Sequence, residues 1–462
     1  MAGPDELGQG RVISAFRSLL TGIASSNRNV MLTLDDCQWM DDQSLRVLSG
    51  LCESGSPHLF LFGMTRPNEG VSNKLKKELK SVTKISLGPI SSDAVRQLAE
   101  SMAGQLPAEA IGVVQQYADG SPFMATAVLR GMVESGVLTV DGKTWRVDND
   151  KLSTFQAAED AGEILVGRLS QLPEEARKLL SAAAVIGKEF SVDAAADLAG
   201  MTTADAAAAI KLVRRQRLVW SRPDSILSFV HDKIRETVLA GLSDPIIRSL
   251  HGQIGRRLET TEPERVFDLA YHFDAAEMHD HALPYALKAA DAARNSFSLA
   301  SAESQLLIAT RAFEHAPREV RHHVEMMMSD VLMLQGEYDR CSQWLDDAER
   351  SAVTDIEKAK VALKRGELFF KRGNKDKAVV HYEASLKRLG QPVYSNSLRL
   401  WWDLTVELLR QTRNTLFPSS CGKRGSSPSE ADRMVLSLYS RISQAYWYTR
   451  DKYCTLWAHL RG

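Results

Sequence analysis

The α/β character of the N-terminal region is clearest in LTLDDCQWMDDQSL, residues 32–45. The apolar run before the acidic pair predicts a buried strand that ends at Asp35. Paired carboxylates after a strand suit a nucleotide-hydrolysing site, because one can hold Mg²⁺ through water while the other orients the attacking water. We assign the metal role to Asp35 and the catalytic role to Asp36. A strand that ends in an acidic helix cap is the structural alternative, since Asp is common at that position.

Elements on both sides of this stretch extend the α/β pattern. Apolar residues three and four apart predict a helix over 12–23, and a second apolar run at 59–62 follows a helix near 44–51. A helix between two apolar runs indicates a crossover and a parallel sheet. Further on, alternation around Asp141-Gly142 predicts a β-hairpin over 137–147.

The next region has the element order of a winged helix. Helical patterns lie near 173–186, 191–199 and 203–216, and two short strands follow at 218–221 and 226–229.

From residue 247 onward the pattern is amphipathic helix with an internal repeat. The clearest copy has small and large residues at offsets 3, 7, 12, 16 and 19 from Gly366; they are Phe369, Gly373, Ala378, Tyr382 and Ser385. In a tetratricopeptide repeat, small residues at such positions let two antiparallel helices approach while aromatics fill the gap. Earlier copies start at Ser329 and Ala290.

We therefore expect a partial α/β sheet, then a winged helix and an all-α tetratricopeptide-like solenoid, in a chain that is mostly α. The expected domains are 1–150, 160–245 and 250–462, with a loose insertion near 417–430. A length of 462 residues suits about three domains. The net charge of -1 gives no global attraction to nucleic acid or anionic membrane.

Five scattered cysteines without a CxxC pair favour a reducing cytosol. The sequence has no apolar run of about 18 residues and no export signal, so we expect a cytoplasmic protein that does not span a membrane. Histidine pairs 322–323 and 279 with 281 are expected to be surface side chains on repeat helices, in preference to metal ligands.

The segment at 32–45 resembles the Walker B signature of predicted ATPases in the signal-transduction (STAND) class of the AAA-like fold. The resemblance continues in Thr65 and Arg66, which are similar to a sensor pair that this class places near the γ-phosphate. It extends to Gly120-Ser121-Pro122, like a motif whose proline packs on adenine. In FVHDKIR, residues 229–235, His231 matches a histidine that senses the diphosphate in some relatives. A structural histidine beside the wing is the alternative.

The order of these motifs is similar to that of ATPase modules in bacterial adenylate or guanylate cyclases, Ser/Thr protein kinases and hybrid histidine kinases. The resemblance implies ATP or ADP with Mg²⁺ as cofactors of the complete family. A phosphate-binding loop of the form G-x-x-x-x-G-K-S/T does not precede Asp35, and Gly142-Lys143-Thr144 lacks the first glycine and follows the acidic strand. We therefore expect no tight nucleotide binding and no independent hydrolysis, and apolar surface left uncovered beside the sheet.

The resemblance implies a regulatory sensor module whose repeats bind a protein partner, and whose state a fused or separate kinase or cyclase reads. The chain itself has no H-R-D or D-F-G kinase signature. One alternative is a non-enzymatic tetratricopeptide scaffold. Another is a winged-helix transcriptional regulator, since Lys211, Arg214, Arg215 and Arg217 could face a DNA groove, but we do not expect nucleic-acid binding because four basic residues are usually a solvated face.

Overall fold

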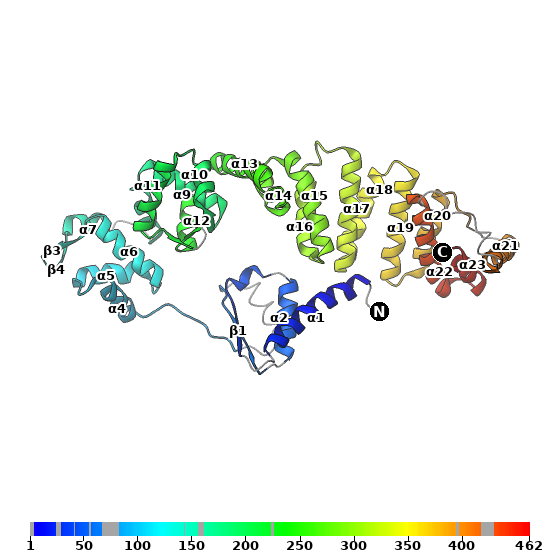
Figure 1. Ribbon diagram of the computed structural model, residues 1–462, viewed down its shortest axis with the longest axis horizontal. Helices are drawn as coiled ribbons and strands as arrows, with labels where there is room; N and C mark the ends of the chain where they lie inside the picture. Colours follow the sequence, from blue (N-terminus) through cyan, green and yellow to red (C-terminus); the bar gives the residue numbers. More distant parts are fainter. Residues whose placement is uncertain are drawn as a thin grey trace. The chain divides into compact units, whose positions relative to one another are not determined.

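A computed structural model describes residues 4–24, 29–40, 42–54, 57–66, 83–142, 144–155, 161–222, 226–393, 397–416 and 429–462. The chain divides into two compact units, one made of Met1–Leu79 with His279–Gly462 and the other of Lys80–Met278. Helices make up most of the described chain, and its strands form three small sheets (Figure 1). The predicted class, mostly α with a small α/β part, is confirmed.

The first unit begins with an α/β segment. Its elements are α1 (Pro4–Ala24), β1 (Val30–Leu34), the 3-10 helix η1 (Cys37–Trp39), α2 (Asp42–Ser54) and β2 (Leu59–Gly63). The two strands pair in parallel, with Val30 opposite Leu59 and Leu34 opposite Gly63. The crossover helix α2 lies between them in sequence, which confirms the predicted parallel arrangement.

This α/β segment exposes much of its apolar surface. Met31 and Phe60 are register partners on β1 and β2, and they are 59% and 60% exposed. On α1, Phe16 and Leu19 are also more than half exposed. The expectation of uncovered apolar surface is confirmed for the described residues. The prediction that the strand before Asp35 is buried is wrong, because every residue of β1 is half-buried or exposed.

The second unit begins with a helical layer followed by a hairpin. Its elements are α4 (Ser92–Ala103), α5 (Ala108–Ala118), α6 (Pro122–Glu134), β3 (Leu138–Asp141), β4 (Thr144–Val147) and α7 (Asn149–Phe155). The strands are antiparallel and turn at Gly142, whose φ of +65° favours glycine. Trp145 Nε1 donates to the carbonyl of Ala103 at 2.7 Å and ties the hairpin to α4. The predicted hairpin is confirmed.

The winged-helix region follows in the same unit. It contains α8 (Ala161–Ser170), α9 (Glu174–Ile186), β5 (Glu189–Ser191), α10 (Val192–Leu198), α11 (Thr203–Arg215), β6 (Val219–Ser221), β7 (Ile226–Phe229) and α12 (Asp232–Ala240). The strands form an antiparallel sheet in the order β5-β7-β6. Three helices and two strands occur where the sequence predicts them. The third strand, β5, was missed, because three residues are too few to show an alternating pattern.

Two further helices, α13 (Asp244–Thr261) and α14 (Val266–Ala275), complete the second unit. The sequence assigns them to the repeat region. The proposed boundaries at 1–150, 160–245 and 250–462 stay a prediction.

The first unit resumes with consecutive helix pairs. They are α15 (His279–Asn295) with α16 (Leu299–Thr310), α17 (Arg318–Gln335) with α18 (Tyr338–Ser351), and α19 (Asp355–Lys371) with α20 (Lys375–Arg388). The helices α21 (Ser397–Leu416), α22 (Glu430–Thr449) and α23 (Lys452–Arg461) follow. Residues 417–428, which hold most of the predicted insertion, lie outside the described residues.

The small-and-large pattern of the repeat has a direct structural cause. A Cβ added to Gly366 on α19 would lie 2.4 Å from Cδ1 of Tyr382 on α20, so only glycine lets the ring pack there. Tyr382 and Ala378 are fully buried in this pair. In the preceding pair, Cys341 on α18 occupies the position that corresponds to Ala378. Its Sγ lies 3.3 Å from the carbonyl oxygen of Ser329 on α17. The predicted repeat positions therefore lie at the contacts between paired helices.

Among the described helices, none combines the length and the apolar character needed to span a bilayer.

Candidate functional site

The acidic pair lies at the carboxyl end of β1. Asp36 adopts a left-handed conformation with φ of 53°, which Asp tolerates better than most residues, and it precedes η1. Its backbone N–H donates to Oδ1 of Asp35 at 2.8 Å. The Asp35 carboxylate is exposed and Asp36 is half-buried. The chain therefore turns sharply where the strand ends, and this turn holds the two carboxylates next to each other.

Gln38 connects this acidic pair to the end of β2. Its Nε2 donates to Oδ1 of Asp36 at 2.8 Å, and its Oε1 accepts the backbone N–H of Arg66 at 3.1 Å. Two backbone hydrogen bonds extend the pairing beyond the strand ends. The N–H of Cys37 donates to the carbonyl of Met64, and the N–H of Met64 donates to the carbonyl of Leu34. Parallel strands end at one edge of a sheet, so the pairing of β1 with β2 places Asp36 and Arg66 at the same edge. Gln38 was not identified from the sequence as the residue that joins them.

The acidic pair meets the minimum that Mg²⁺ requires from protein. Mg²⁺ usually keeps several waters and takes one or two carboxylates plus substrate phosphates. No group of three or more acidic, His or Cys side chains suited to a metal occurs among the described residues. Asp35 and Asp36 fit a metal that phosphates hold in place, and they do not form a complete metal cage. Nearby, burial raises the pKa of the Cys37 thiol, with the carboxylates of Asp35 and Asp36 acting in the same direction, so this cysteine is a neutral packing residue.

A tight turn positions Pro122 at the start of α6. Gly120 has a φ of +70°, and a Cβ there would lie 2.4 Å from Cβ of Pro89. The Gly120 carbonyl accepts the N–H of Ile90 at 2.9 Å. Ser121 caps α6 by accepting the N–H of Met124, and Pro122 occupies the first turn, where its missing N–H costs nothing. Only glycine fits the first position of this Gly-Ser-Pro motif.

His231 lies beside this motif in the same unit. Its ring stacks on Phe123, with centroids 3.9 Å apart and planes inclined by 17°. Its Nδ1 accepts the backbone N–H of Lys233 at 3.1 Å, which makes His231 the N-cap of α12. Because Nδ1 accepts, the neutral ring carries its proton on Nε2. The structural role that we kept as an alternative for His231 is present in the structure, and contact with a nucleotide stays a prediction.

The far end of α6 is also attached to the winged-helix region. The buried guanidinium of Arg168 donates to both oxygens of Glu134, at 2.7 and 3.1 Å, and to the carbonyl of Gln216 at 3.4 Å. Phe123 packs against the winged-helix core at the other end. Both ends of the helix that begins at Pro122 are therefore fixed to the winged helix.

The predicted site residues thus fall into two clusters. Asp35, Asp36 and Arg66 meet at the sheet edge of the first unit, whereas in the second unit His231 stacks on Phe123, the residue after Pro122. That all five contact one nucleotide stays a prediction.

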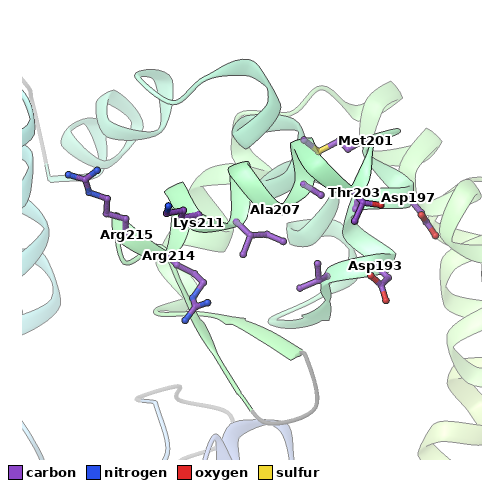
Figure 2. Close-up of a pocket in the computed structure, with 12 residues that line it drawn as sticks. Asp193, Asp197, Met201, Thr203, Ala207, Lys211, Arg214 and Arg215 are labelled. Carbon is purple, nitrogen blue, oxygen red and sulfur yellow. The ribbon is translucent and has the colours of Figure 1, made fainter.

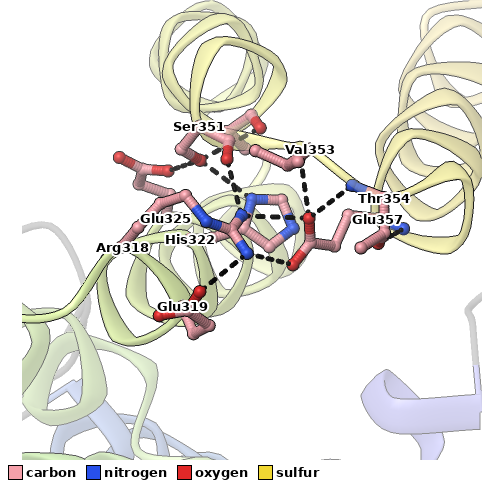
Figure 3. A network of polar contacts seen from close by, with 9 residues as sticks. Arg318, Glu319, His322, Glu325, Ser351, Val353, Thr354 and Glu357 are labelled. Atoms are coloured by element: carbon pink, nitrogen blue, oxygen red, sulfur yellow. Dashed lines mark hydrogen bonds and ion pairs between the residues drawn. The ribbon is translucent and has the colours of Figure 1, made fainter.

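One histidine prediction is wrong. His322 is buried, and its Nδ1 lies 2.9 Å from Oγ of Ser351, which also donates to Glu325 at 2.5 Å (Figure 3). Burial lowers the pKa of His322. Its neighbour His323 is exposed, as expected for the next residue on a helix whose buried face includes residue 322.

Comparisons with known proteins found a protein of similar sequence and a solved structure of similar fold. The peroxide stress-activated histidine kinase mak3 of Schizosaccharomyces pombe is 20% identical over 455 residues, which cover 92% of this chain and 19% of that kinase. A solved Signal Transduction ATPase with Numerous Domains (STAND) protein with a tetratricopeptide repeat sensor, from Pyrococcus horikoshii, is 12% identical with a TM-score of 0.45. That match covers 96% of this chain and 63% of that one. The chain spans less than two thirds of either protein, and no family model matches it.

Proposed function

We propose that the chain is the regulatory sensor module of a multidomain signalling protein, with a nucleotide-site remnant that does not hydrolyse ATP by itself. The observation that carries the proposal is the hydrogen-bonded link from Asp36 through Gln38 to Arg66 at the carboxyl edge of a parallel sheet. Ligands in open α/β folds bind at that edge. The helix pairs that follow supply a surface for a partner.

Each residue of the two clusters has a proposed role toward ATP or ADP. Asp35 holds Mg²⁺ through water, Asp36 orients a water molecule, and Arg66 faces the terminal phosphate. Pro122 packs on the base and His231 presents its Nε2–H to a phosphate oxygen. The bound nucleotide with its Mg²⁺ supplies the anionic group that these residues contact.

The chain alone is proposed to be inactive because it lacks groups that phosphoryl transfer needs. Phosphoryl transfer depends on donors that surround the phosphates and on a lysine that offsets their charge. The sequence before Asp35 provides neither. Without that cradle, the two carboxylates repel an anionic nucleotide, so ATP and ADP are not held tightly. Two carboxylates without bound phosphates also leave Mg²⁺ with too few ligands for tight binding.

The sensing surface is proposed to be the helix pairs from α15 onward, and the sensed molecule a protein partner. A kinase or nucleotide cyclase, fused or separate, reads the state of the module in the cytoplasm. The histidine kinase similar to this chain over 92% of its length is consistent with such an effector. Neither nucleic acid nor a membrane is part of the proposal.

A second candidate is a non-enzymatic scaffold whose repeats alone bind a partner. One observation favours it: polar atoms of the proposed site already have internal partners. Asp36 Oδ1 accepts from Gln38, and His231 Nδ1 accepts from Lys233. A scaffold would use these bonds only to hold the fold.

Nucleotide titration separates the two. The chain is titrated with a fluorescent ADP analogue and Mg²⁺, and phosphate release from ATP is measured in parallel. We expect weak binding that Arg66→Ala or Pro122→Ala reduces, no turnover above background, and no effect of Asp35→Asn on phosphate release. Absence of any binding would select the scaffold. Robust Mg²⁺-dependent turnover that Asp35→Asn abolishes would overturn the proposed inactivity.

A further inference from the structure

A surface hollow opens on the winged-helix region between α10 and α11 (Figure 2). Its volume is about 760 Å³, within the range of roughly 300–1,000 Å³ of ligand pockets. It contains none of the residues assigned to the nucleotide. Its floor is apolar, and half of the residues that form it are alanine; the floor residues are Val192, Ala196, Met201, Ala206, Ala207 and Ile210.

Charge is distributed unevenly around this hollow. Lys211, Arg214 and Arg215 line its end nearest the C-terminus of α11, and all three are exposed. Their side chains form no ion pair or hydrogen bond within the described part of the chain. A negative helix C-terminus favours cations in the last turn, which accounts for the position of Arg214 and Arg215. It does not account for the apolar hollow beside them.

The opposite end of the hollow is acidic. Asp193 and Asp197 of α10 line it, and Asp197 is paired with Arg257 of α13. Counting only partners among the described residues, the hollow therefore has three unpaired cations at one end and one unpaired carboxylate, that of Asp193, at the other.

We propose that this hollow is the docking groove for an acidic amphipathic segment of a protein partner. The apolar face of such a segment covers Ala207 and Ile210, and its carboxylates lie against Lys211 and Arg214. Small floor residues let the backbone of the segment come close.

Charge and floor chemistry together favour a peptide over nucleic acid. A phosphate backbone would satisfy the cations, but it brings no apolar surface to the floor and it is repelled by Asp193. A peptide that is apolar on one face and acidic at one end only suits the basic end, the apolar floor and the acidic end of the hollow. Nucleic acid is one outcome of the test.

The test uses the full chain and a fluorescein-labelled helical peptide of about 14 residues, with Leu residues three and four apart, Glu at the remaining positions of one half and Gln at those of the other half. Two further probes are the same peptide with Gln in place of Glu, and a DNA duplex of about 20 base pairs. Anisotropy is measured at near-physiological salt. We expect the acidic peptide to bind with a Kd on the order of 10–100 μM, and the Gln peptide and DNA to bind more weakly.

Three variants locate the contact. Lys211→Glu with Arg214→Glu reverses the charge of the basic end, and Ala207→Trp fills the hollow without changing charge. Arg177→Glu with Arg256→Glu is the matched control, because it makes the same charge change at exposed residues outside the hollow. Circular dichroism and a thermal melt check that each variant folds.

The first two variants should weaken the acidic peptide at least roughly tenfold, and the control should leave it unchanged. Equal binding of Glu and Gln peptides would overturn the proposal, as would insensitivity to Ala207→Trp. Tighter binding of the DNA duplex, lost in the charge-reversal variant and kept in Ala207→Trp, would instead identify a nucleic-acid face and also overturn it.

Discussion

The ring of Phe123 lies over the imidazole of His231 with centroids 3.9 Å apart, and joins the first turn of α6 to the N-cap of α12. Because Phe123 follows Pro122 directly, this stack fixes the proposed base-binding proline relative to the winged helix. The buried Arg168–Glu134 pair fixes the other end of the same helix. Movement of Pro122 within the second unit is therefore coupled to the winged helix.

Substitution of Phe123 by Ala is expected to loosen this joint. The change removes the stack and a half-buried ring from the winged-helix core, at a cost of about 2–4 kcal/mol. Hydrogen exchange should rise in peptides from α6 and α12 and stay unchanged in α19 and α20.

A pair of His231 variants separates the stack from the cap. His231→Asn keeps an N-cap acceptor and loses the ring, whereas His231→Ala loses both. We expect His231→Ala to be less stable than His231→Asn by about 1 kcal/mol in urea unfolding. Equal stabilities would show that the bond to Lys233 contributes nothing.

Gly366→Ala is expected to destabilise the repeat pair by about 1–3 kcal/mol, because the new Cβ would overlap the ring of Tyr382. Gly112→Ala on α5 is the matched control. No atom lies within 4 Å of a Cβ built there, so replacing this helical glycine should stabilise by about 0.5–1 kcal/mol. Opposite shifts of the urea midpoint would confirm both, and a neutral Gly366→Ala would contradict the packing argument.

As the pH falls, the α13–α14 pair should lose stability before its two buried histidines are protonated in the folded state. Nδ1 of His251 and Nδ1 of His272 lie 2.8 Å apart, so one donates and the other accepts. Burial, with the neighbouring His251 charge, lowers the pKa of His272 to about 4. An unfolded histidine takes up its proton near pH 6.5, so the contribution is complete above that pH and is lost as pH falls through about 4.

The expected loss between pH 7.5 and 5 is about 2 kcal/mol. His251→Leu with His272→Leu removes both ring nitrogens and should flatten this part of the profile of unfolding free energy against pH. The exposed His323→Gln is the control and should leave the slope unchanged. An unchanged slope in the double variant would assign the acid sensitivity to other groups.

Glu357 is expected to be the main polar residue that holds α17 to α19. Its carboxylate accepts two bonds from Arg318, at 3.0 and 3.1 Å, and the backbone N–H groups of Val353 and Thr354 (Figure 3). The Arg318 hydrogen bond, followed by the two N–H groups, lowers the pKa of Glu357 to about 2. Its contribution is therefore present above about pH 4.5 and lost as pH falls through about 2.

Glu357→Gln should cost about 1–3 kcal/mol at neutral pH, since it replaces charge-assisted bonds by neutral ones. Glu319→Gln is the control, because Glu319 also contacts Arg318 but is mostly exposed. It should cost less than Glu357→Gln, because an exposed ion pair is screened by water. Thermal unfolding monitored at pH 7 compares the two, and equal costs would show that the partly buried bonds of Glu357 add nothing beyond those of the exposed pair.

Much of the fold was predictable because its signals are local. The run before Asp35, the Asp141-Gly142 turn and the helix periodicities each lie within one element, and each element occurs where they predict it. The Gly366 and Tyr382 positions were also readable, since a repeat imposes its contacts at fixed offsets. Strand β5 was missed because it forms only by pairing with β7.

The sequence by itself determined the parallel α/β segment, the hairpin and the helical repeat, because each has a local pattern or a fixed period. Only the tertiary structure decided that Gln38 joins those two, that His231 caps a helix and stacks on Phe123, and that His322 is buried. Each of these depends on side chains from separate elements whose spacing in sequence follows no period. Burial and hydrogen-bond geometry, which give such side chains their roles, exist only once the helices have packed.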